Sequence, residues 1–329
     1  MEIRKLTTSD LEKLYAFNQK VFPERKIPFK EYIDFWLSKS EDEIGLNLIL
    51  VDESNDIHGQ ILSSSMSYFY KGEKHDSLWG FDLIVEESFR KDNWGLDIQM
   101  YRNDLFPSSY GTGVAPDALK IQTLLGNSLL GHLKKYLAIV NTLWSISSIG
   151  RGVVPVRKYP KEVNVDGYVF KMINKEDLPY FRHSFNSELW EPSRDRSYLE
   201  WRFFSPLHEY AFYYNEKISS YFVMRTAVFK HITMNMLVDY RCGLENSFSM
   251  ECIVKAAKII TSKIRLAIVV TGSSLAAIDV VLEKQGFRPS GEPRPMNGLI
   301  DVKDKKEEIK ARRFAFVTFA DSDGETDIF

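Results

Sequence analysis

Residues 78–96, LWGFDLIVEESFRKDNWGL, decide the fold of this chain. Leu83, Ile84 and Val85 form a compact β-prone apolar run, which predicts a buried strand. A polar turn follows, and Trp94 and Leu96 then begin a segment that predicts the start of a helix. The stretch therefore predicts a strand, a short turn and a helix in direct succession.

The turn in this stretch has the composition of an anion-binding site. The first backbone N–H groups of a helix have no acceptor inside the helix, so a basic turn that leads into them suits an anion. Asn and Gly tolerate positive φ and let consecutive N–H groups point inward. We expect a diphosphate cradle formed by Arg90, Lys91, Asp92, Asn93, Trp94, Gly95 and Leu96.

The spacing Arg90-x-x-Asn93-x-Gly95 after a strand resembles a known motif. It is similar to the acyl-CoA-binding pattern Gln/Arg-x-x-Gly-x-Gly/Ala of the GNAT (GCN5-related N-acetyltransferase) superfamily, with Asn93 at the first glycine. Asn visits left-handed geometry more readily than most residues. The resemblance implies an acyl-CoA, with acetyl-CoA as the default donor. Its extended pantetheine arm would pair like a strand with the backbone of Leu83, Ile84 and Val85.

Length and composition limit the possible classes of protein. A chain of 329 residues with 44% hydrophobic content can furnish two domains. The net charge of −2 gives no global attraction to nucleic acid, and no apolar run is long enough to span a membrane. The two cysteines and the lack of a signal-peptide core predict a cytoplasmic protein, and the histidines show no metal-ligand spacing.

The order of the expected elements occurs twice. Strand, helices, hairpin, strand, helix, strand and helix follow one another in each half, with shifts of 167 residues from Asp10 to Asp177, 165 from Trp36 to Trp201, and 160 from Gly126 to Gly286. This order matches the GNAT fold. We expect an α/β protein of two tandem GNAT-like domains, residues 1–150 and 151–329, each a mixed, mostly antiparallel sheet flanked by helices.

Three further segments are assigned from pattern alone. A helix is expected from Leu130 to Leu143, a linker at 149–155 where glycine and proline break that helix, and a final strand at 314–319. In the second half, a strand at 235–239 is followed by a turn with a single glycine and the acidic Glu245. We therefore expect acyl-CoA in the first half only.

An amine that attacks a thioester needs a base, and the leaving thiolate needs an acid. Asp82 is the first candidate for the base and Glu86 the second, because both share a face near the end of the strand. Either carboxylate has a plainer interpretation, as a loop-orienting or solvent-facing group. Members of the resembled family often carry a tyrosine acid four residues before a Gly-Phe landmark. The matching positions here are Gln122 and Leu282, and Tyr110 is the substitute candidate.

Trp201 and Arg202 are the candidate acceptor-binding residues. The Trp-Arg-Phe sequence resembles tandem GNAT proteins linked to bacterial surface-polysaccharide genes, and a forked guanidinium suits anion recognition. The alternative is a buried ion pair of Arg202 with a carboxylate such as Glu200 or Asp239.

The expected function is an acyl-CoA-dependent N-acyltransferase that acts on a small-molecule amine, with an amino sugar favoured by the Trp-Arg-Phe likeness. The rival is a catalytically inactive binding or assembly module, which Asn93 and the missing tyrosine favour. A relative that uses charged tRNA is disfavoured because no basic surface signal is present.

Overall fold

The computed structural model describes residues 1–141, 157–181, 188–205, 207–229, 232–244, 247–300, 302 and 305–322. The chain forms two compact units. Unit 1 contains Met1–Tyr68, Lys74–Leu130 and Pro295–Lys306, and unit 2 contains Phe69–Glu73, Gly131–Arg294 and Glu307–Phe329. The expected boundary at 150/151, with its linker, lies outside the described residues. Each unit includes a segment from the opposite half of the sequence.

Unit 1 is built on one mixed sheet. Its strands lie in the order β1 (Glu2–Lys5), β2 (Leu48–Val51), β3 (Ile57–Tyr70), β4 (Glu73–Val85), β5 (Ser109–Thr112) and β15 (Arg294–Leu299). The β1–β2, β2–β3 and β5–β15 pairs are antiparallel, and β4 pairs with β5 in parallel.

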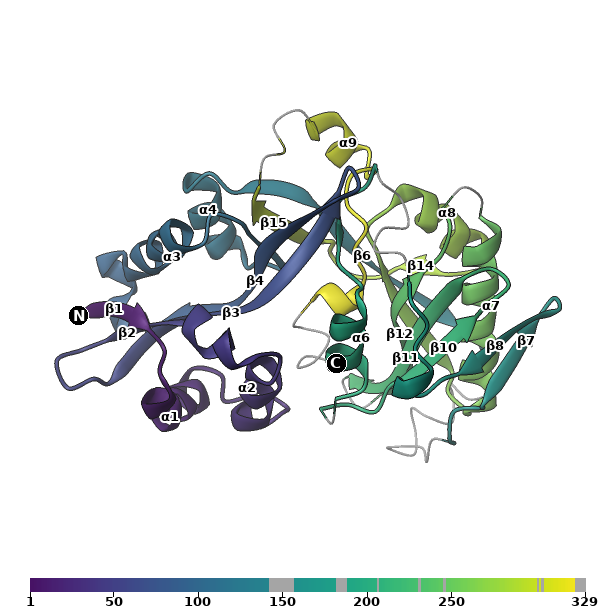
Figure 1. Ribbon diagram of the computed structural model, residues 1–329, viewed down its shortest axis with the longest axis horizontal. Coiled ribbons are helices and arrows are strands. Elements are labelled where there is room, and N and C mark those ends of the chain that lie inside the picture. Colours follow the sequence, from purple (N-terminus) through teal and green to yellow (C-terminus); the bar gives the residue numbers. More distant parts are fainter. Residues whose placement is uncertain are drawn as a thin grey trace. The chain divides into compact units, whose positions relative to one another are not determined.

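Helices cover both faces of this sheet (Figure 1). On one face lie α1 (Leu11–Val21) and α2 (Phe29–Leu37), where the Trp36 ring packs 4.9 Å from Trp79 and 4.5 Å from Phe81. On the other face lie α3 (Trp94–Leu105) and α4 (Pro116–Leu124). There Ile98 joins a small buried cluster, against which Leu83 packs.

Unit 2 contains a second mixed sheet. Its order is β6 (Ser128–Ile139), β13 (Ile268–Ser273), β12 (Ile232–Arg241), β11 (Ser220–Phe229), β10 (Ala211–Asn215), β8 (Tyr168–Met172) and β7 (Glu162–Val165), and β14 (Arg288–Pro289) also pairs with β6. Only the β12–β13 pair is parallel among these described pairs. The other elements include β9 (Glu191–Pro192), α6 (Arg196–Phe203), α7 (Phe248–Lys263), α8 (Ala276–Lys284) and α9 (Lys306–Lys310).

The two units share a succession of elements. A hairpin leads to a long strand, a helix, a strand parallel to the first, and a second helix: β4–α3–β5–α4 in unit 1 and β12–α7–β13–α8 in unit 2. The second helix ends each time at a left-handed glycine, Gly126 with φ 87° and Gly286 with φ 85°. This agrees with the α/β fold of mostly antiparallel sheets flanked by helices.

Two assignments from the sequence were wrong. Residues from Leu130 were expected to form a helix, but Ser128–Ile139 is the strand β6, paired with β13 from Lys134 to Ile139. Residues 314–319 were expected to form a strand, but they make only an isolated bridge, Trp190 to Ala315, before the 3-10 helix η6 (Phe319–Asp321). In both places contacts distant in sequence determine the backbone.

Candidate active site

The predicted cradle lies between β4 and α3. A 3-10 helix, η3 (Glu87–Asp92), leads to Asn93, which has φ 63° and ψ 14° and forms the N-cap of α3. The backbone N–H groups of Leu96 and Asp97 donate to the Asn93 carbonyl at 2.7 and 3.1 Å. Those of Trp94 and Gly95 come earlier in the helix, where no intrahelical acceptor exists. Asn93, which stands at the first glycine of the resembled motif, has the left-handed conformation.

Basic side chains flank these N–H groups. Arg90 and Lys91 are exposed in η3. The Nε of Arg90 donates to the Val85 carbonyl at 2.9 Å, which ties the turn to the end of β4. A negative ligand at this position would meet positive charge from both the helix dipole and the turn.

Gly95 is open on its side-chain face. A Cβ added there would lie 3.8 Å from Ile121 Cδ1 and 4.0 Å from Val85 Cγ2, which is ordinary van der Waals contact. The protein itself therefore has room for an alanine at this position. A group that approaches the backbone at Gly95 would use the same space.

The strands β4 and β5 pair over a short distance only. Their register covers Leu78 with Ser109 and Trp79 with Tyr110, and β5 ends at Thr112. Meanwhile β4 continues to Val85. The edge of β4 from Phe81 to Val85 therefore runs beyond this register toward the start of α3, as an extended ligand that adds like a strand would need.

Asp82 interrupts β4 with a left-handed conformation, φ 46°. Phe81 and Asp82 are neighbours in sequence, yet both contact the α1–α2 layer, Phe81 through Trp36 and Asp82 through Arg25. Asp82 Oδ2 accepts from Arg25 Nη2 at 2.7 Å, and both side chains are at most 10% exposed. The Arg25 guanidinium also lies 4.3 Å from the centre of the Tyr32 ring. Sequence reasoning missed Arg25, because nothing local marks it as the partner of Asp82.

A cavity of about 600 Å³ adjoins this ion pair. It is formed by α1, the α1–α2 connection and the start of α2, and Arg25 is part of its wall. The rings of Tyr15, Phe22 and Phe29 supply apolar surface, and Glu12 and Lys30 supply charge.

Glu86 is also held by an ion pair. Its Oε1 accepts from Lys20 Nζ at 2.8 Å and lies 3.5 Å from His58 Nδ1. The carboxylate side chain is 12% exposed. The Glu86 carboxylate is therefore mostly buried, and its Lys20 partner belongs to α1.

Tyr110 is buried in β5 at 2% exposure, beside Trp79 in the parallel register. Gln122 lies in α4, where its Oε1 accepts from Asn297 Nδ2 at 3.2 Å, and Leu282 is in the core of unit 2. The role of Tyr110 as an acid stays a prediction.

Trp201 and Arg202 belong to α6 in unit 2. Arg202 is fully buried, and it donates to the Ala320 carbonyl at 3.4 Å and to the Tyr210 hydroxyl at 2.9 Å. Trp201 packs 5.9 Å from the Tyr198 ring. Both of these contacts of Arg202 lie within unit 2. Acceptor recognition by Trp201 and Arg202 stays a prediction.

In unit 2 the ends of β12 and β13 are covered by residues 314–321. Thr318 Oγ1 donates to Asp239 Oδ1 at 2.7 Å at the end of β12, and Ser274, just after β13, bonds the Ala315 carbonyl at 2.7 Å. A Cβ on Gly272 would lie 2.8 Å from the Phe319 ring. The chain itself therefore fills the position that corresponds to the open β4 edge of unit 1.

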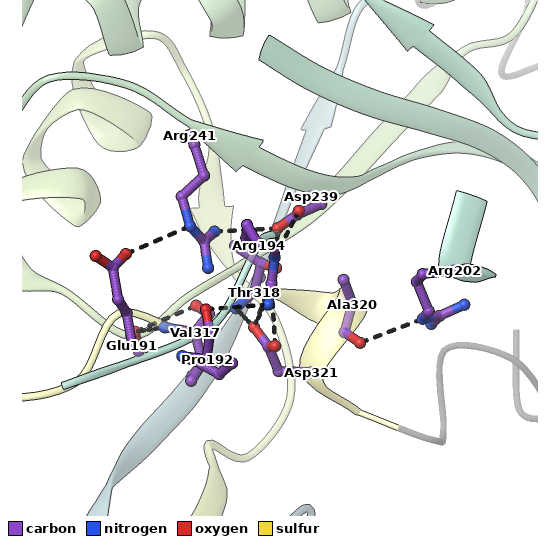
Figure 2. A network of polar contacts seen from close by, with 12 residues as sticks. Glu191, Pro192, Arg194, Arg202, Asp239, Arg241, Val317, Thr318, Ala320 and Asp321 are labelled. Carbon is purple, nitrogen blue, oxygen red and sulfur yellow. Dashed lines mark hydrogen bonds and ion pairs between the residues drawn. The ribbon is translucent and has the colours of Figure 1, made fainter. Parts of the chain in front are cut away.

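A buried ionic network holds this segment (Figure 2). Arg194 donates to Asp239 at 2.9 Å and to both oxygens of Asp321 at 2.7 Å. Arg241 donates to Asp239 at 3.0 Å and lies 3.6 Å from Glu191. Burial alone would raise the pKa of Asp239, but Arg194 and Arg241 hold it below its usual value. The network fixes the segment that contains Thr318 and Asp321 against β12.

The fold is that of the GCN5-related N-acetyltransferases. A GCN5-related N-acetyltransferase from Anabaena variabilis has a TM-score of 0.61 and 11% identity, over 92% of this chain and 73% of that chain. An enzyme of the same description from Kribbella flavida has a TM-score of 0.59 and 12% identity, over 90% and 70%.

A structure of Saccharomyces cerevisiae N-myristoyltransferase with bound myristoyl-CoA is also similar. Its TM-score is 0.61 at 12% identity, over 90% of this chain and 79% of that chain. No protein-family model matches the chain, and no curated protein matches its sequence.

The described residues contain no group of three His, Cys, Asp or Glu side chains that could hold a metal ion. Nor does that part of the chain include a helix with the length and apolar content to cross a membrane.

Proposed function

We propose that unit 1 binds an acyl-CoA, with acetyl-CoA as the default donor, and transfers the acyl group to a small-molecule amine. The observation that carries this proposal is the edge of β4, which runs past β5 toward the open N-terminus of α3. The diphosphate would accept from the N–H groups of Trp94 and Gly95, with Arg90 and Lys91 nearby. The pantetheine amides would pair with Leu83, Ile84 and Val85.

A bound acyl-CoA supplies an activated thioester. In the transfer a C–N bond forms and the C–S bond breaks, so one proton must leave the amine and one must reach the thiolate. Asp82 and Glu86 remain the candidate bases, and Tyr110 the candidate acid. Backbone N–H groups near the end of β4 are the candidate donors to the oxyanion.

We place the acceptor in the cavity formed by α1 and the α1–α2 connection. Aromatic rings and charges of both signs line it, as a small polar amine requires. An amino sugar fits this chemistry, because its ring has apolar faces and its hydroxyls seek polar partners. Arg25 would couple the cavity to Asp82.

A non-catalytic binding module is the second candidate. Asp82 and Glu86 are both engaged by cations, and the tyrosine acid is replaced by Gln122 and Leu282. Such a protein would bind the coenzyme without turnover.

Thermal shift with acetyl-CoA tests binding, since a ligand of the folded state raises the melting temperature. We expect a rise that Gly95→Glu abolishes and that the control Gly45→Glu, in open space, retains. Thiol release over a panel of amines then separates enzyme from binding module. The absence of a shift with any acyl-CoA would contradict both.

A further inference from the structure

Unit 1 contains a buried arginine whose partners in the described part of the chain are all neutral. Arg102, on α3, is 3% exposed. Its Nη2 donates to Ser109 Oγ at 3.0 Å, and the Gln99 side-chain amide lies 2.7 Å from Nη2 and 3.3 Å from Nε. Within the described residues no Asp or Glu reaches ion-pair distance of it. Burial lowers the pKa of Arg102 to about 10, so the guanidinium is still charged at neutral pH.

A charge removed from water is destabilising unless an opposite charge compensates it. Arg194 and Arg241 of unit 2 follow this rule, because they face Asp239, Asp321 and Glu191. Among the residues that the structure describes, Arg102 has neutral partners only. A ligand that brings a negative charge would supply the missing compensation.

The position of Arg102 indicates which part of a ligand it would meet. A Cβ on Gly80 would lie 2.1 Å from Arg102 Nη1, so the guanidinium rests on β4 at Gly80, directly after the register with β5. From Val85 back to Gly80 an extended strand spans about 16 Å. A pantetheine arm that starts at the cradle and follows β4 therefore carries its acyl end toward Gly80.

We propose that Arg102 selects an acyl group that itself ends in a carboxylate, such as a dicarboxylic monoacyl-CoA. This inference rests on the proposed function, since it needs the coenzyme along β4. The carboxylate would accept from the guanidinium on the α3 side of the sheet, beside Ser109. A charged pair at a buried site discriminates strongly against a neutral analogue.

The test compares dissociation constants of the purified full chain, by calorimetry, for CoA, acetyl-CoA, butyryl-CoA and succinyl-CoA. Butyryl-CoA is the neutral control for succinyl-CoA. We expect succinyl-CoA to bind at least ~10-fold more tightly than butyryl-CoA. Equal affinities would overturn the proposal and leave coenzyme binding intact. Failure of all four to bind would overturn the proposed function as well.

Two variants locate the effect. Arg102→Gln is expected to remove the succinyl preference and to leave the affinity for CoA within about twofold. Gly80→Ala keeps the arginine but displaces its flexible end, and it is expected to remove the preference too. The control Arg196→Gln makes the same change of charge on an exposed residue of α6 and is expected to retain it.

A preference that persists in both Arg102→Gln and Gly80→Ala would assign the selectivity to other groups and overturn the proposal. If Arg102→Gln does not fold, Gly80→Ala and the wild-type comparison still decide, because neither removes the guanidinium.

Discussion

Asn93 shows how a residue other than glycine can adopt the left-handed conformation in a turn. Its φ of 63° is sterically costly for most residues and milder for asparagine. The motif spacing predicted this conformation from the sequence. The sequence did not reveal Arg25 or Arg102, because their importance depends on Asp82, Gly80 and Ser109, which are distant in the chain.

A substitution at Gly95 should change the stability of the protein and its affinity for the coenzyme in opposite directions. Gly95→Ala is expected to raise the free energy of unfolding by about 0.5–1 kcal/mol, because alanine favours a helix and the site has room. The same methyl group would crowd the coenzyme and weaken binding. Urea unfolding and calorimetry measure the two effects. Equal acetyl-CoA affinity in wild type and variant would show that the ligand does not approach this backbone.

Variants of the Arg25–Asp82 pair test whether Asp82 is a structural carboxylate or the catalytic base. Asp82→Asn removes the carboxylate charge that lies 2.7 Å from the buried Arg25 guanidinium, so we expect a loss of about 3 kcal/mol in unfolding free energy. Arg25→Met combined with Asp82→Asn should recover most of it.

Measuring the thiol-release activity of the same variants completes the comparison of their stabilities. Were Asp82 the base, the double variant would regain stability and stay inactive in thiol release. Recovery of turnover with stability would leave Asp82 an orienting role only.

At the scale of elements, the start of α1 is sensitive to acid. Hydrogen bonds from Arg4 and Thr7 hold the pKa of Asp10 well below its ordinary value. In the unfolded chain this carboxyl protonates near pH 3.9, so its stabilisation is present above that pH and is lost as the pH falls further. Asp10→Asn should therefore reduce the decline in stability below about pH 4. Denaturant midpoints across the pH range measure it, with the exposed Asp117→Asn as control.

The elements that the sequence predicted best are those with local signals. The hairpin β2–β3 and the end of β4 carry turn residues or strand patterns. β6 was misassigned because Leu130, Leu133 and Tyr136 recur at a spacing that a helix also allows. Its pairing with β13, more than a hundred residues away, decides its conformation.

At the scale of the whole molecule, unit 2 depends on the network around Arg194. Asp321→Asn removes one of two carboxylates from a buried guanidinium, so we expect a loss of about 3 kcal/mol in unfolding free energy. Acetyl-CoA binding should persist in folded protein, since the cradle belongs to unit 1. If Asp321→Asn lowers the unfolding free energy by less than ~0.5 kcal/mol, as substitutions of surface residues usually do, this account of the network is wrong.

The strand composition of the two units has a practical consequence for anyone who wishes to divide the protein. A fragment of residues 1–150 would carry β6 without β13 and would keep β5 without β15. Each half expressed alone should expose unpaired strand edges and aggregate. Co-expressed halves should purify together, and a well-behaved isolated half would refute this. Neither half of the sequence therefore carries all the strands of one sheet, and we expect neither to serve as a free-standing module in engineering.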